Sequence, residues 1–89
     1  MSDPAATLPV RVEGLDINVM DDGFVVYQPS HDRVHYLNPT AGLLLELCNG
    51  ALAEAELAER VRLAWNLPEA PHGDVAAGLQ ELRAQELIR

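Results

Sequence analysis

In the first half of the chain, apolar residues alternate with polar ones at a period of two, which is typical of β-strands. This alternation predicts a half-buried strand over residues 15–20 that ends in a tight turn at residues 21–23. The segment Phe24–Tyr27 is apolar on both faces and is therefore expected to be the middle strand of three. A third strand is predicted over Arg33–Leu37, and in a simple meander it forms an edge of the sheet.

In the second half, apolar residues recur every three or four positions, which is typical of amphipathic helices. The spacing predicts helices over residues 39–48 and 54–65, and a third that Asp74 caps and that passes into Leu87 and Ile88. Asn38 is expected to cap the first helix. The residues expected in the core include Phe24, Val26, Leu44, Leu47, Leu57, Val61, Leu79 and Leu82, with Trp65 at the end of the second stripe.

These elements define the expected fold class. Three short antiparallel strands in a meander followed by three helices are typical of a small winged-helix-like α+β domain. With 89 residues the chain is long enough for one such domain, which we expect over residues 10–89. Residues 1–9 contain two prolines and little to bury, so they are expected to form a mobile tail.

The amino-acid composition excludes several classes of function and cellular location. Six Lys and Arg against fourteen Asp and Glu give a formal net charge of −8, which opposes binding to nucleic acid or to an anionic membrane surface. The single cysteine cannot form an internal disulfide, and the first residues lack the basic and apolar regions of a signal peptide. No run approaches the length needed to cross a bilayer. A cytoplasmic protein is expected.

No motif for catalysis is present. The chain has no glycine-rich phosphate loop, no paired cysteine ligands and no nucleophile elbow, so we expect a protein that is not an enzyme and uses no cofactor. His31 and His35 in an extended strand would lie about 13 Å apart, which is too far for one metal ion. Cys48 is expected to be a buried core residue.

A family resemblance sharpens this interpretation. The segments that carry it are Tyr36–Ala41, Leu47–Gly50, Glu56 with Leu57, and Asp74 with Val75, Leu79, Leu82 and Arg83. In this order and spacing, over about residues 22–88, they resemble the PqqD family, whose members act as peptide chaperones for ribosomally synthesised and post-translationally modified peptides. Two departures stand out. Ala53 replaces the usual Ser or Thr cap of the second helix, and Gln85 and Glu86 replace a glycine after the third.

The resemblance implies a function and a site. Members bind the leader peptide of a precursor as an extra strand beside strand three, in a groove closed by the third helix, and deliver it to a separate modifying enzyme. For this chain, that enzyme would be a radical S-adenosylmethionine maturase or a leader peptidase. The implied peptide-binding residues are Arg33, Val34, His35, Tyr36, Leu37, Val75, Gly78, Leu79, Leu82 and Arg83, of which Arg33 and Arg83 would favour acidic leader positions.

The residues alone leave other classes open. A winged-helix transcription regulator shares this order of elements, but the region from Asp74 to Arg89 carries three acidic residues against two arginines. An acidic carrier protein requires a serine at a helix start, and Ser2 and Ser30 do not occupy such a position. A self-associating structural module remains an alternative, because an open sheet edge also pairs with itself.

Overall fold

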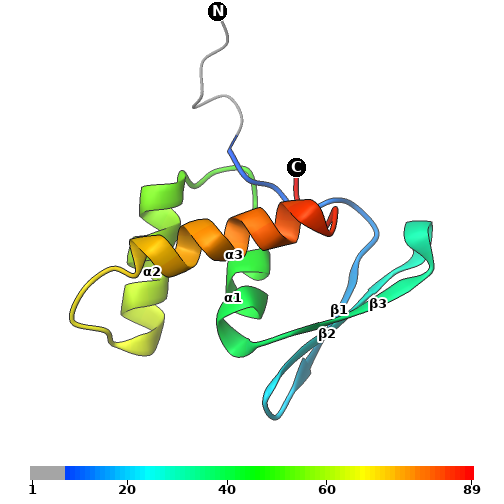
Figure 1. Ribbon diagram of the computed structural model, residues 1–89, viewed down its shortest axis with the longest axis horizontal. Helices are drawn as coiled ribbons and strands as arrows, with labels where there is room; N and C mark the ends of the chain where they lie inside the picture. The colour runs from blue at the N-terminus through cyan, green and yellow to red at the C-terminus, as the bar shows by residue number, and fades with distance from the viewer. Residues whose placement is uncertain (1–7) are drawn as a thin grey trace, which may run out of the picture.

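The computed structural model describes residues 8–89 and shows a three-stranded antiparallel sheet followed by three helices (Figure 1). The sheet order is β1-β2-β3, which confirms the expected α+β class and the meander. Most of the expected mobile tail lies outside the described residues. The elements are β1 Asp16–Met20, β2 Gly23–Gln28, β3 Arg33–Leu37, α1 Pro39–Leu47, α2 Glu54–Trp65 and α3 His72–Ala84, with a single 3₁₀ turn at Pro29–His31 between β2 and β3.

The register of the sheet separates a covered face from an open one. Val26 pairs with His35, and Phe24 pairs with Leu37. Because neighbouring strand residues alternate between faces, these four side chains share the face that carries the helices. Of the four, Val26, His35 and Leu37 are buried. The opposite face is open, and its exposed apolar side chains are Met20, Tyr27, Val34 and Tyr36.

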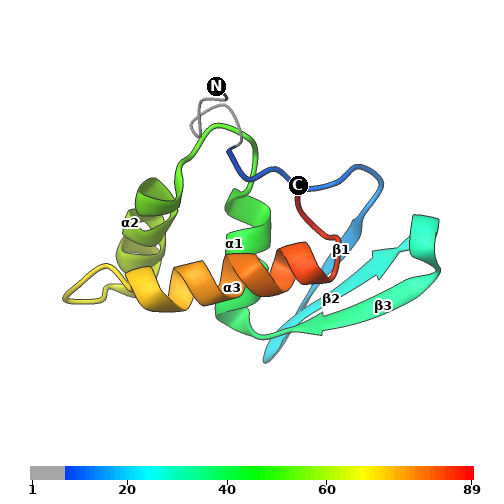
Figure 2. The ribbon, with the colours of Figure 1, turned by 45° about the horizontal axis from the view of Figure 1, so that its top comes forward.

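The helices gather at one end of the molecule, and the sheet extends from the other (Figure 1). In both Figure 1 and Figure 2, α3 crosses in front of α1 and runs from α2 toward the sheet, and it packs against both helices. At Gly42 an added Cβ would overlap the ring of Phe24, so α1 approaches β2 too closely for any larger residue. The core lies between the three helices and the covered face of the sheet.

Most of the predicted core is confirmed. Val26, Leu44, Leu57, Val61, Leu79 and Leu82 are buried, whereas Phe24 and Leu47 are only partly buried and pack against this cluster. The prediction for Trp65 is wrong, because its side chain is 46% exposed. Residues four apart advance by 400°, so each step along the stripe turns about 40° away from the core. Two steps from Leu57 carry Trp65 to the edge of the buried face, at the last residue of α2.

The helix ends differ from the sequence predictions in informative ways. The Asn38 side chain accepts a hydrogen bond from Ala41 N at 2.8 Å, which confirms it as the N-cap of α1. Asp74 is not the cap of α3, because the helix begins at His72 and places Asp74 in its first turn, where a carboxylate favours the helix dipole. The third helix does end in the left-handed conformation, which Glu86 adopts with φ 61°. Leu87 N then donates to Leu82 O at 3.0 Å.

The second helix begins at the predicted residue although its N-cap position lacks a capping side chain. Ala53 has no side-chain oxygen to offer, but Glu56 reaches back and accepts a hydrogen bond from Ala53 N at 2.9 Å. This contact is half of a capping box, and it satisfies one of the amide groups that a helix start leaves unpaired. The helix therefore runs over Glu54–Trp65, as the spacing predicts.

The two ends of the described chain lie side by side, which the sequence does not predict. Val10 N donates to Arg89 O at 3.3 Å, and Arg89 N donates to Val10 O at 2.9 Å. Pro9, which we expected in the mobile tail, is buried, and its carbonyl accepts from Gly50 N at 2.9 Å. The segment that precedes the sheet is thus held against the end of α1 and the C-terminal residues.

Candidate functional site

The open edge of β3 is the centre of the candidate site. In the part of the chain that the structure describes, β3 pairs with β2 and with no other strand. One row of its backbone N–H and C=O groups is therefore available on the side away from β2. The strand leads directly into α1, and α3 lies along the same side of the molecule (Figure 2).

A groove lies where the end of β3 meets α1 and α3, and we call it the β3–α3 groove. Its volume is about 420 Å³. Apolar or small side chains form most of its lining, so it suits the side chain of a partner better than an ion. The lining residues are Leu37, Asn38, Thr40, Ala41, Leu44, Asp74, Ala77, Gly78, Glu81 and Leu82.

Gly78 keeps the groove open at its floor. An added Cβ at this position would lie 2.7 Å from Leu44 Cδ1, so α1 and α3 meet here at close range. A larger residue at position 78 would project toward the leucine and reduce the space between the helices. The close packing of two helices thus determines the depth of the groove.

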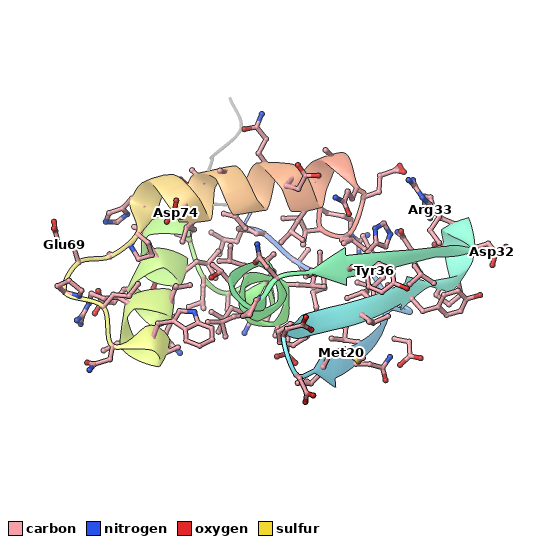
Figure 3. The ribbon with its side chains drawn as sticks, turned by 60° about the horizontal axis from the view of Figure 1, so that its bottom comes forward. Met20, Asp32, Arg33, Tyr36, Glu69 and Asp74 are labelled. Atoms are coloured by element: carbon pink, nitrogen blue, oxygen red, sulfur yellow. The ribbon has the colours of Figure 1, made fainter. Side chains whose placement is uncertain are left out.

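The charges along this side of the molecule are unequally distributed. Asp74 and Glu81 are the two charged residues that line the β3–α3 groove. Arg33 is at the far end of β3 and makes no ion pair within residues 8–89. Figure 3 shows Arg33 and Asp74 at opposite ends of the space between β3 and α3. The groove end of the site is therefore acidic, whereas the far end of β3 carries Arg33 next to Asp32.

A buried polar network joins β3 to the end of α3. His35 is 7% exposed, with Nδ1 2.8 Å from Gln85 Oε1 and Nε2 2.9 Å from Gln28 Oε1. The amide nitrogen of Gln28 donates to Glu86 O, and that of Gln85 donates to a carboxylate oxygen of Glu81. Both amide oxygens are thereby held toward the imidazole ring. This network closes the space between β3 and α3 near Gln85 and leaves it open toward Leu37.

The structure brings some of the predicted site residues together and separates others. Leu37, Gly78 and Leu82 line the β3–α3 groove. Val75 and Leu79 are fully buried in the core, so they shape the groove from beneath without reaching its surface. Val34 and Tyr36 lie on the open face of the sheet, and Tyr36 is 81% exposed.

Arg83 does not line the β3–α3 groove. At 100° per residue it lies about 140° around the helix from Gly78, beyond the buried stripe. Burial raises the pKa of the Cys48 thiol, and the charge of Arg83 acts in the opposite direction on that thiol. The contact that Arg83 was expected to make with a peptide in the groove is therefore not supported by its position.

Sequence reasoning missed the acidic and small residues of the groove. Asp74, Ala77, Glu81 and Gln85 recur at three- and four-residue spacing, so they form a second stripe beside the buried one. That spacing is visible in the sequence and could have predicted the groove face of α3. The partners of His35 could not be predicted, because Gln85 is 50 residues away in the chain.

The cysteine and histidine side chains outside the groove do not form a reactive or metal-binding site within residues 8–89. Burial raises the pKa of the Cys48 thiol to about 11, against smaller opposing effects of Arg11 and Arg83, so the thiol is protonated at neutral pH. His31 faces Glu86, with 3.0 Å between Nε2 and the carboxylate. Across residues 8–89, no three His, Cys, Asp or Glu side chains lie close enough together to hold a metal ion.

The fold and the site define a small α+β domain with an open sheet edge beside an apolar groove. The sequence matches the model of the family described as Coenzyme PQQ synthesis protein D (PqqD) over residues 23–88, which is most of the chain. The chain therefore belongs to the PqqD family. No match was found among the curated proteins or among the solved structures.

Family membership gives the general role. PqqD proteins take part in the biosynthesis of coenzyme PQQ and of ribosomally synthesised, modified peptides. They are accessory proteins without catalytic activity of their own, and they typically interact with biosynthetic partner proteins. Among the helices that the structure describes, none has the length and apolar character needed to cross a membrane.

Proposed function

We propose that this protein binds the leader segment of a ribosomally synthesised precursor peptide as an antiparallel strand along β3 and presents it to a separate modifying enzyme. The modifying enzyme is a radical S-adenosylmethionine maturase or a leader peptidase. The observation that carries the proposal is the open edge of β3 beside the β3–α3 groove. Membership of the PqqD family supports the same role.

Strand addition requires two features, and this site has both. Backbone pairing needs a row of unpaired N–H and C=O groups, which the edge of β3 offers. Selectivity needs pockets for alternate side chains of the added strand. Leu37 faces the helices, so a peptide residue opposite it would also face them and would enter the β3–α3 groove.

The alternate side chains of the added strand would point away from the helices. Residues opposite Val34 and Tyr36 would project from the open face of the sheet, beside two exposed side chains. They would remain accessible to a third component while the groove holds their neighbours. This division suits a protein that presents a bound peptide to an enzyme.

The test begins with a selection of 12-residue peptides from a random displayed library on the purified protein. A selected peptide is then synthesised with single N-methyl groups at each position in turn. Because only every second amide of an edge strand pairs with its neighbour, N-methylation should weaken binding with a period of two. A loss without this period, or a library that yields no binder, would contradict strand addition.

A further inference from the structure

We infer that the β3–α3 groove selects a lysine or arginine side chain of the bound peptide, with its aliphatic stem on the apolar floor and its cation at the acidic rim. This inference rests on the proposed function and specifies the chemistry of the peptide at that site. It differs from the expectation from sequence, in which Arg33 and Arg83 favour acidic leader positions and the groove takes apolar ones.

The shape of the groove fits a long, unbranched side chain. Its volume of about 420 Å³ exceeds what a small apolar residue would fill. The floor consists of apolar or small residues from β3, α1 and α3, which are Leu37, Ala41, Leu44, Ala77, Gly78 and Leu82. The methylene stem of a lysine or arginine packs on such a surface while the charged end stays at the rim.

The charge at the rim favours a cation. Asp74 and Glu81 line the groove, and none of the basic residues that the structure describes does. They lie seven residues apart on α3, or about 10 Å along the helix axis, so they flank the opening at positions two helical turns apart. Glu81 also accepts from the Gln85 amide at 2.6 Å, which fixes its carboxylate near the groove. An anionic side chain would meet two like charges here.

Arg33, at the opposite end of β3, adds a preference at a second position of the bound peptide. Arg33 is exposed and about 13 Å from Leu37 along an extended strand, which equals four residues of an added peptide. In an antiparallel peptide, the residue opposite Leu37 precedes the residue opposite Arg33. The peptide should therefore carry its basic residue first and an acidic residue about four positions later.

The experiment uses the library-selected peptide. The peptide residue that enters the groove is identified by nuclear Overhauser contacts to the Ala77 methyl group, and it is then replaced by lysine, norleucine and glutamate. Norleucine keeps an unbranched four-carbon chain without the charge, so it isolates the contribution of the cation. We expect the lysine peptide to bind about fivefold more tightly than the norleucine peptide, and the glutamate peptide to bind most weakly.

Variants of the protein provide the matched control. Asp74→Asn and Glu81→Gln should each reduce the preference for lysine over norleucine, whereas Glu69→Gln, in the loop before α3, should leave it unchanged. If norleucine binds as tightly as lysine, or if Asp74→Asn leaves the preference intact, the inference is wrong while strand addition stands. If the selected peptide shows no contact with the groove at all, both the inference and the proposed function are contradicted.

Discussion

Within residues 8–89, neither edge of the sheet pairs with a further strand, yet the two edges differ in what lies beside them. Along β3 the neighbour is α3, and the β3–α3 groove opens between them toward the end of the strand. Along β1 the exposed residues include Asp16 and Asn18, and the hollow at its start is lined largely by the residues that lead into the strand, 10–15. Within residues 8–89, helices thus lie beside the β3 edge, whereas the segment that leads into the sheet lies beside the start of the β1 edge.

This difference explains why one edge is a better candidate than the other. An open edge alone pairs with any extended chain, because its backbone groups carry no sequence information. Side-chain pockets next to the edge make the pairing selective. Among the strands of residues 8–89, β3 alone combines an open edge with a groove whose walls include two helices. The helices therefore supply the side-chain contacts that can make pairing at this edge selective.

The largest expected effect is on the fold that supports both edges. Leu57 is fully buried in α2, and replacing it with alanine removes packing between the helices. We expect Leu57→Ala to lower the free energy of unfolding by about 2–5 kcal/mol, measured by urea denaturation. Leu63→Ala on the same helix is the control, because Leu63 is 60% exposed. Equal midpoints for the two variants would show that the helix faces are wrongly assigned.

The second prediction separates the two edges. Ala77 is exposed and lines the β3–α3 groove, so Ala77→Phe should fill the groove and weaken binding of the library-selected peptide about tenfold or more. Ala76→Phe is the matched control, since Ala76 is the exposed neighbour on the same helix and does not line the groove. Fluorescence anisotropy measures both affinities. Similar losses of affinity for the two variants would contradict peptide binding in the β3–α3 groove.

The third prediction concerns Cys48, which lines the hollow near β1. Its pKa is raised from 9.0 to about 11 in the folded protein, so the unfolded chain loses the thiol proton first as the pH rises. Stability should therefore fall between about pH 9 and pH 11, and the Cys48→Ala variant should show a smaller fall. Thermal denaturation across this range tests the prediction, and identical pH profiles would contradict it.

The sequence predicts the elements well because each depends on local spacing. The strand Arg33–Leu37 and the helix Glu54–Trp65 have the predicted bounds, since periodicity and helix-end signals agree there. The start of α3 was misplaced because Asp74 resembles an N-cap, while the preceding residues His72 and Gly73 extend the helix by one more partial turn. Local signals in the sequence therefore predict which helices and strands form more reliably than they predict the residue at which each begins.

The candidate site was only partly predictable for the same reason. The position of β3 at the edge follows from a meander, but which side of α3 faces it depends on packing between distant residues. Arg83 was assigned to the groove from the family pattern, and the rotation of α3 places Asp74 and Glu81 there instead. The contacts of His35 with Gln28 and Gln85 likewise arise only when three separate elements meet.

Peptide binding along the β3 edge is tested most directly by a proton–nitrogen NMR titration of the labelled protein with the library-selected peptide. We predict that the largest amide shifts occur in Arg33–Leu37 and on the groove face of α3, at Asp74, Ala77, Gly78 and Glu81. The amides of Asp16–Met20 should change little, although they belong to the same sheet. Largest shifts in Asp16–Met20 or in Glu54–Trp65 would contradict binding at the β3 edge.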